Sequence, residues 1–510
     1  MLIKSLIIGL YAGLAGVDGN NTQFKIGRPL VAGMIVGFLL GDVKKGLTVG
    51  TILEILGLGM VGLGGVSPPN IIVAGILGAA FAIEAGISAK LAVCLALPFA
   101  MIVQWGMSRV YKGYSWFADK IDEYAGRGEI NKVELLHISG IIPLFIFYGV
   151  VVFFSFYLGI NIIEKWIKLL PQFLVEGLEM AGSLMPAVGF ALLLKAMLKR
   201  KYIFLVLLGF TFVAFFRFPL IAVVLIVTAF VMYKFLKERS NKSENTDRIM
   251  TFNLNSRKVT KKELYKIACR SLFLQASFNY KKMQATGWLY SILPALRRIY
   301  KERQNDLKES LKAHLETFNS HPFLTPLILG IVVAMEEEHQ NVDAIKKVKT
   351  TLMSAFGGIG DSVIWMMVFP ICAGLGISLA SQGSLWGPVL FLALFNVIHF
   401  TLVFGGINYG YKKNLGLLPN LRNYTKVISS VSSVVGLVIV GALIALYVNV
   451  SLPVIVGLVK TRSIYAVLDN FLEIIFMLFA YCLFRKGLSP NRVIGIAVLF
   501  GIVLKYLKVL

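Results

Sequence analysis

Charged residues are scarce in this chain of 510 residues, since only 15% of them are Asp, Glu, Lys or Arg. Hydrophobic residues make up 57%, against roughly 45–50% in an average soluble domain. A soluble protein this apolar would expose more hydrophobic surface than water tolerates. We therefore expect an all-α polytopic membrane protein, with 48 glycines that let its helices pack closely.

Acidic residues are especially few, with 27 Asp and Glu against 51 Lys and Arg, which gives a net charge of +24. Such an excess raises nucleic-acid binding as an alternative. The basic residues, however, lie between apolar runs and do not follow one polar face. This pattern is typical of cytoplasmic loops, so we expect the lipid bilayer and no nucleic acid among the partners.

Cysteine and histidine are rare, with four and five residues respectively. The cysteines are Cys94, Cys269, Cys372 and Cys482. They form no C-x-x-C pair, so small core residues are a better interpretation than a metal or redox site. His339 follows Glu336, Glu337 and Glu338, but consecutive helical residues point in different directions. A charged helix end fits this run better, and we expect no metal site.

Motifs for nucleotide chemistry and catalysis are missing as well. Residues 57–62 match G-x-G-x-x-G, and Glu84 lies at a fitting distance beyond them. That motif indicates a dinucleotide site only within a strand–turn–helix unit, and here it lies in continuous apolar sequence. Neither a Walker A loop nor a serine-nucleophile elbow is present. The sequence therefore predicts no cofactor and no catalytic residue.

A basic hydrophilic stretch divides the chain into two nearly equal parts. We predict a first domain over 1–240, a cytoplasmic linker over 241–262 and a second domain over 263–510, because the stretch has a linker composition and a positive charge. The first apolar segment, 2–17, has no charged n-region or cleavage site and is interpreted as a retained membrane segment.

The second domain opens with apolar residues at helical spacing beside charged ones. This pattern predicts two or more amphipathic cytoplasmic helices over 263–318, followed by a membrane part over 323–510. A solvated basic face is the simpler interpretation of their charges.

Three polar-tipped interruptions break the apolar runs. Pro29 follows Arg28, Pro68 and Pro69 precede Asn70, and a glycine-rich stretch precedes Asp361. Broken helices survive at membrane depth only beside protein or a watery cavity, and in transporters substrates bind there. We expect broken or re-entrant helices around a cavity, with close helix packing as the alternative.

Isolated polar residues in apolar surroundings are the candidate substrate contacts, because polar groups at membrane depth are costly and usually serve a site. They are Asp18, Gln23, Glu54 and Asn70 in the first half, and Gln275, Asn279, Gln284 and Asp361 in the second. Carboxylates and amides suit the hydroxyls of a sugar. A surface position for Asp18 and a helix N-cap role for Asp361 remain alternatives.

Several stretches together resemble a known transporter family. They are FLQASFNYKKMQATGWLYSILPALRR at 273–298, KTTLMSAFGGIGDSVIW at 349–365, GSLWGPVLFLALFN at 383–396, QFKIGRPLVAGMIVGFLLGDVKKGLTVGTILEILGLG at 23–59 and GSLMPAVGFALLLKAM at 182–197. The second half is similar to the IID membrane subunit of mannose-family phosphotransferase systems, and the first half to the IIC subunit. The chain thus resembles a fusion of the two.

The resemblance implies a bacterial inner-membrane permease that takes up a hexose or hexosamine, which a separate phosphorylated IIB protein, served by IIA, phosphorylates. It also implies two related halves with core and V-shaped scaffold domains, elevator-type transport, a homotrimer, and use by some bacteriocins as a docking site. Lys281 and Lys282 stand where relatives can carry an acidic residue, so the identity of the sugar is not carried over.

Two other functions stay open at the level of sequence. An ion-coupled secondary sugar transporter would accumulate solute without IIA or IIB. A membrane receptor or scaffold would tolerate the loss of Glu54 and Asn279.

Overall fold

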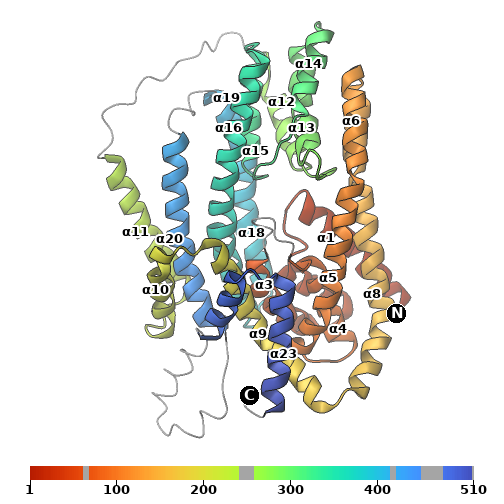
Figure 1. Ribbon diagram of the computed structural model, residues 1–510, viewed down its shortest axis with the longest axis vertical. Helices are drawn as coiled ribbons and strands as arrows, with labels where there is room; N and C mark the ends of the chain where they lie inside the picture. The colour runs from red at the N-terminus through yellow and green to blue at the C-terminus, as the bar shows by residue number, and fades with distance from the viewer. Residues whose placement is uncertain (61–67, 241–257, 414–420, 449–474, 508–510) are drawn as a thin grey trace.

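The computed structural model describes residues 1–60, 68–240, 258–413, 421–448 and 475–507. This part of the chain consists of helices and loops, with no β-sheet (Figure 1). Seven of its helices are long and apolar enough to cross a bilayer. The prediction of an all-α multi-pass membrane protein is confirmed.

In the described part of the first half there are twelve helical segments. They are α1 (Leu2–Asn20), α2 (Pro29–Leu40), α3 (Val43–Gly59), α4 (Ile71–Glu84), α5 (Ala89–Gly113), α6 (Ser115–Arg127), α7 (Ile130–Ser139), α8 (Ile141–Leu169), α9 (Gln172–Met197), η2 (Arg200–Tyr202), α10 (Ile203–Ala214) and α11 (Leu220–Ser240). Of the predicted linker, residues 241–257 lie outside the described residues.

The second half follows from α12 onwards. Its described helices are α12 (Lys261–Ser271), α13 (Ala285–Ile299), α14 (Gln304–His314), α15 (Thr325–Glu337), α16 (Val342–Gly360), η4 (Asp361–Val368), α17 (Phe369–Ala380), α18 (Trp386–Phe400), η5 (Thr401–Gly405), α19 (Gly406–Lys413), α20 (Leu421–Tyr447), the helix Ile475–Arg485 and α23 (Pro490–Tyr506). α3 runs through Gly57, so the rejected dinucleotide motif begins inside a helix, and its residues 61 and 62 lie outside the described part.

Short apolar helices accompany the full spans, as expected for broken helices. α2 and α4 have 12 and 14 residues, whereas a complete span needs about 20. α2 begins at Pro29, whose fixed φ suits the first helical position, and it ends at Gly41 in the left-handed conformation. A Cβ on Gly33 would collide with the backbone of Gly46 in α3, so only glycine permits this close crossing.

Two of the three predicted interruptions are confirmed, and the third is wrong. Helices begin at Pro29 and directly after Asn70. At Asp361, however, no new helix starts: α16, η4 and α17 form one helical stretch of 39 residues, Val342–Ala380. The glycines before Asp361 are accommodated because the backbone widens into a π-helical segment and does not break.

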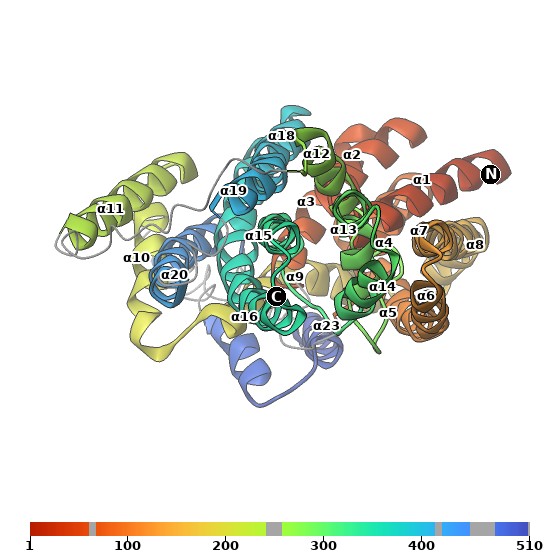
Figure 2. The same cartoon turned by 90° about the horizontal axis from the view of Figure 1, so that it is seen from above.

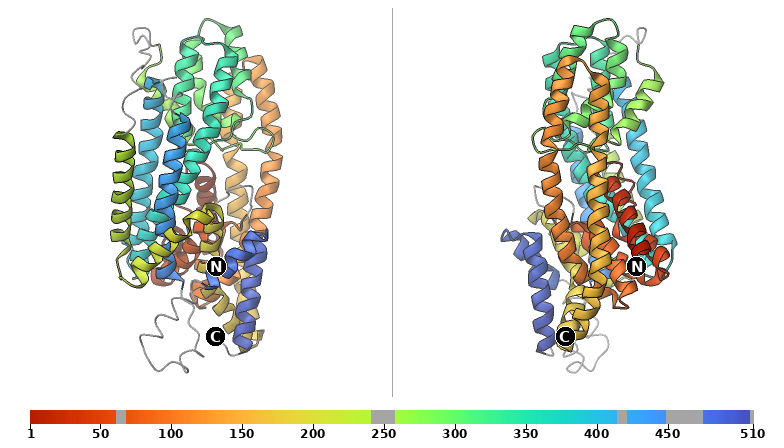
Figure 3. Two further views of the ribbon diagram at one scale, coloured as in Figure 1. Left: turned by 60° about the vertical axis from the view of Figure 1, so that its left-hand side comes forward. Right: turned by 90° about the vertical axis from the view of Figure 1, so that its right-hand side faces the viewer.

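Each half packs terminal helices against the other half. α10 and α11 belong to the first half but contact α20 and α17 of the second, while α23, near the end of the second half, packs along α9 of the first. Figure 2 shows α10 and α11 at one edge, separated from α1–α8 by helices of the second half. Figure 3 shows the packing of the two halves against each other from two further sides.

Three helices of the second half form a cap at one end of the molecule. α12, α13 and α14 gather there with α6 of the first half (Figure 1). They share a second hydrophobic core with α15, α16 and α19, in which Trp288 is fully buried. The helices predicted over 263–318 are therefore present, and their cytoplasmic location and the domain boundaries stay predictions.

Candidate functional site at the junction of the two halves

Asp18 organises the loop that follows α1. Its buried carboxylate accepts hydrogen bonds from the backbone N–H groups of Phe24 (2.6 Å) and Ile26 (3.0 Å), and from the Thr22 hydroxyl (2.7 Å). Three donors to one carboxylate fix the path of residues 21–28. The alternative of a surface position for Asp18 is excluded by its 3% exposure.

This loop carries two side chains in strained backbone positions. Gln23 and Lys25 have φ values of 54° and 70°, which are uncommon for non-glycine residues and cluster at functional sites. Both side chains are buried, and the Lys25 Nζ donates to the Gln23 Oε1 at 3.1 Å. The fold therefore holds a lysine and an amide at a fixed point below the cap.

Lys25 reaches into an aromatic cluster of the second half. Its Nζ lies 4.4 Å from the centroid of Trp365 and 5.2 Å from that of Phe395. On the same interface, the side-chain amide of Asn396 donates to the backbone oxygen of Phe24 at 2.9 Å. The loop after α1 thus forms a junction between the halves, and the sequence interpretation missed both Lys25 and Asn396.

Two histidines complete this junction. His321 and His399 are buried beside Phe323, whose ring stacks on His399 at 3.9 Å between centroids. Within the described structure His321 Nε2, His399 Nδ1 and Asn396 Oδ1 have no hydrogen-bond partner. Buried polar atoms without partners are rare and call for a functional explanation. Sequence interpretation considered histidine only as a metal ligand and therefore overlooked them.

Glu54 lies behind the loop, fully buried, in an ion pair with the mostly buried Arg28. Its Oε1 is 2.7 Å from Arg28 Nη2, and its Oε2 accepts the Leu30 N–H at 3.1 Å. Arg28 also covers the face of Phe369, 4.5 Å from the ring centroid. Glu54 therefore anchors the start of α2 and orients Arg28 towards the second half.

Asn70 belongs to a neighbouring polar network within the first half. It caps α4 by accepting from the Val73 N–H, and its amide donates to the Tyr148 hydroxyl at 2.7 Å. Asn20 joins the network because its amide donates to the same Tyr148 hydroxyl at 3.4 Å, and it accepts a hydrogen bond from the Tyr111 hydroxyl. These amides and hydroxyls lie beside the loop after α1 and could pair with sugar hydroxyls.

The predicted residues of the second half lie mainly in a turn under the cap. The Asn279 side chain accepts from the Lys281 and Lys282 N–H groups, and Gln284 accepts from the Ser320 N–H at 2.9 Å. Gln275 is partly buried in the preceding turn. The rings of Phe278 and Tyr280 in this turn contact Tyr111, so it adjoins the Asn20 network.

Asp361 takes a separate position from those amides. It is partly buried in η4, and the neighbouring Gly360 packs so closely on the His321 ring that a Cβ would collide with it. The structure therefore brings Asp18, Gln23 and Glu54 to the junction, Asn70 beside it, Asp361 close to His321, and the other three to the overlying turn.

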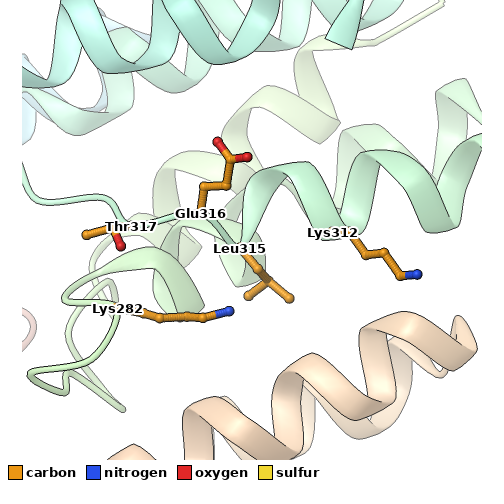
Figure 4. Close-up of a pocket in the computed structure, with 5 residues that line it drawn as sticks. All are labelled: Lys282, Lys312, Leu315, Glu316 and Thr317. Carbon is orange, nitrogen blue, oxygen red and sulfur yellow. The ribbon is translucent and has the colours of Figure 1, made fainter. Parts of the chain in front are cut away.

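An open pocket of about 500 Å³ lies on the cap side. Figure 4 shows its lining, Lys282, Lys312, Leu315, Glu316 and Thr317. Lys282 forms an ion pair with Asp122 of α6, and Lys281 forms one with Asp119. The hydrogen bond with Asp119 raises the pKa of Lys281 above its usual value. These pairs tie the turn around Asn279 to the first half.

Metal-ligating clusters are not found in the part of the chain that the structure describes, where no three His, Cys, Asp or Glu side chains converge. All four cysteines are unpaired thiols.

Two family models match the chain one after the other. Residues 2–233 match the sorbose-specific IIC component of phosphotransferase systems, and residues 258–510 match the IID component of the mannose/fructose/sorbose family.

Curated relatives agree with this division. The fructose permease IID component of Bacillus subtilis (strain 168) is 35% identical over 47% of this chain and 92% of its own length. The N-acetylgalactosamine permease IIC component 1 of Escherichia coli (strain K12) is 30% identical over 49% of this chain and 95% of its own length. A solved chain from the complex of the mannose transporter ManYZ with a microcin is 29% identical, covers 50% of this chain and 99% of that chain, and superposes with a TM-score of 0.31.

Proposed function

Because the chain belongs to the mannose/fructose/sorbose family of phosphotransferase system membrane components, with IIC and IID parts in one polypeptide, and is a sugar permease, we propose that its sugar binds at the junction of the halves. The observation that carries this proposal is the cluster of unpartnered buried atoms on His321, His399 and Asn396. They face a loop whose conformation Asp18 fixes.

The chemistry of the junction suits a neutral, hydroxyl-rich ligand. Gln23 and Asn396 offer amide groups, and the histidines offer nitrogen atoms that can donate or accept. Trp365 and Phe323 provide flat apolar faces for the carbon side of a sugar ring. Asp18 and Glu54 are saturated by protein donors, so we assign them to holding the loop and Arg28 in place.

The polar residues further towards the cap would receive the sugar on its way out. Asn70 and the turn that contains Gln275, Asn279 and Gln284 lie between the junction and the cap-side pocket. The sugar would leave there to meet phosphorylated IIB, which works with IIA. Asp361 would border the route through its position next to His321.

The wider setting follows from the family and the charge distribution. We propose a bacterial inner membrane, with the cap and the basic linker on the cytoplasmic side. Elevator movement of core against V-shaped scaffold domains, a homotrimeric assembly, and use as a bacteriocin docking site belong to the same proposal.

Reconstitution in vesicles tests the function directly. We expect labelled hexoses or hexosamines to appear inside as phosphosugars only when phosphorylated IIB is supplied on the cap side. Accumulation of unmodified sugar driven by an ion gradient would identify a secondary transporter, and neither product with any cognate IIB would favour a receptor. His399→Leu and Asn396→Leu should each weaken uptake of every sugar that the unmodified protein transports, and unchanged uptake would refute the junction as the site.

A further inference from the structure

A second pocket lies away from the junction and is strongly basic. It has a volume of about 290 Å³ and is lined by Lys195, Leu198, Arg200, Tyr481 and Arg485. Its residues come from the end of α9, from η2 and from the helix Ile475–Arg485, so both halves contribute.

The cations of this pocket have no acidic partners within the described structure. The salt bridges there involve none of Lys195, Arg200 and Arg485. The sequence explains this, because no Asp or Glu occurs between Glu179 and Glu238 or after Glu473. Three convergent cations without a carboxylate favour an anionic ligand.

The surroundings of the pocket are apolar and face outwards. Phe204 and Ile203 on α10 are 58% and 50% exposed, and Ile475 and Phe479 on the adjoining helix are 59% and 44% exposed. In a chain that crosses the bilayer, exposed side chains of this kind are typical of surface that contacts lipid tails or a partner subunit. The pocket therefore borders apolar surface on which acyl chains can lie.

Chain direction places the pocket on the cap side of the bilayer. α8 follows α7 and runs from the cap side to the opposite end of the molecule, where α9 begins (Figure 1). α9 has 26 residues, which span about 39 Å and exceed the hydrocarbon core of about 30 Å. Its last turn, with Lys195, therefore returns to the leaflet that we propose to be cytoplasmic.

We propose that this pocket binds the phosphate headgroup of an anionic phospholipid from the cytoplasmic leaflet. Lys195, Arg200 and Arg485 surround the phosphate, Tyr481 supplies a hydroxyl, and the acyl chains lie over α10 and the helix Ile475–Arg485. A lipid in this position bridges the two halves outside the sugar pathway. The role is independent of which sugar is carried.

The test measures which lipid stays with the purified protein. Detergent-solubilised protein is exposed to equal amounts of phosphatidylglycerol and phosphatidylethanolamine, and retained lipid is quantified by native mass spectrometry. We expect selective retention of phosphatidylglycerol. Combining Lys195→Gln, Arg200→Gln and Arg485→Gln should weaken the selectivity roughly 100-fold.

A charge-matched control removes three exposed lysines of the cap and its neighbourhood, Lys261→Gln, Lys266→Gln and Lys301→Gln, and should retain the lipid. Equal retention of phosphatidylglycerol by the two triple variants would overturn the proposal. Equal retention of the two lipids by the unmodified protein would also overturn it, and that measurement does not depend on any variant folding. Inorganic phosphate forms a further arm. If it raised the melting temperature of delipidated protein as much as phosphatidylglycerol does, the site would be for free phosphate and the lipid assignment would be wrong.

Discussion

The ammonium group of Lys25, on a loop of the IIC half, lies 4.4 Å from the centroid of Trp365 in the IID half. Lys25 is buried and Trp365 is partly buried, and a cation over an indole face contributes about 0.5–2 kcal/mol, with the upper end for a desolvated cation. This contact couples the loop that Asp18 organises to the long helix that carries Trp365. Removing this contact should therefore show whether transport depends on coupling between the two halves.

Replacing either partner should impair transport. Lys25→Met and Trp365→Leu are each expected to lower phosphosugar formation in vesicles roughly tenfold. Combining them should cost little more than the worse single change, because both remove the same interaction. The control is Lys201→Met, which removes an exposed cation over Tyr202 and should leave activity unchanged. Losses that simply multiply in the double variant would contradict the coupling.

Glu54 and Arg28 should behave as a buried ion pair. Glu54→Ala leaves the Arg28 guanidinium without its carboxylate, and breaking a buried pair from one side costs about 3–5 kcal/mol. We expect a large fall in the melting temperature of the purified protein. Adding Arg28→Ala should restore part of it. The partly exposed pair of Lys4 with Glu84 provides the comparison, since Glu84→Ala should cost about 0–1 kcal/mol. A similar loss in both cases would refute a special role for Glu54.

Replacing His399 should affect sugar binding and protein stability differently. His399→Leu removes a buried nitrogen that has no hydrogen-bond partner among the described residues, so stability should stay equal or rise. The KM for sugar should nevertheless increase roughly tenfold, as expected for a lost hydrogen bond to substrate. Tyr148→Phe is the matched comparison, because it deletes a hydroxyl that Asn70 contacts and should cost about 1 kcal/mol. Reduced stability with unchanged KM in His399→Leu would show a structural histidine.

The ion pairs under the cap should control the turn around Asn279. Lys282→Asp places two carboxylates together at Asp122, and we expect slower phosphosugar formation at saturating phosphorylated IIB. Exchanging the charges, with Asp122→Lys added, should restore the rate. Failure of the exchange to restore it would assign Lys282 a role beyond this pair.

The pH dependence of the neighbouring pair has a definite sign. The pKa of Lys281 is raised in the folded protein by Asp119, so the contribution of the pair is complete below the pKa of an unfolded lysine. It disappears as pH rises through the folded value. The difference in melting temperature between the unmodified protein and Lys281→Gln should therefore be constant near neutral pH and shrink only in alkaline solution.

Most of the fold could be predicted from the sequence because bilayer physics constrains composition strongly. Apolar runs, the basic stretch and the starts at Pro29 and after Asn70 follow from local rules. The glycines before Asp361 misled that reasoning, since a π-helical segment accommodates them without a break. No local rule shows whether a glycine-rich stretch will end a helix or be accommodated within it.

The site was only partly predictable, for a different reason. Costly polar residues such as Asp18 and Glu54 stand out in apolar sequence, and they lie at the junction. Their roles could not be predicted, because only the fold shows that protein donors saturate both carboxylates. Lys25 was hidden because lysines are common in this basic chain, and its aromatic partners lie more than 300 residues away in the sequence.

The interlocked packing has a consequence for the single-chain design. With α23 seated on α9 and α10 on α20, the affinity between the halves resides in their surfaces, and a tether mainly raises their effective concentration. Two separately synthesised polypeptides cut within residues 241–257 should therefore find each other. Joining the halves in one polypeptide ensures that they are made in equal amounts. Neither half can then accumulate in the bilayer with its interface to the other half uncovered.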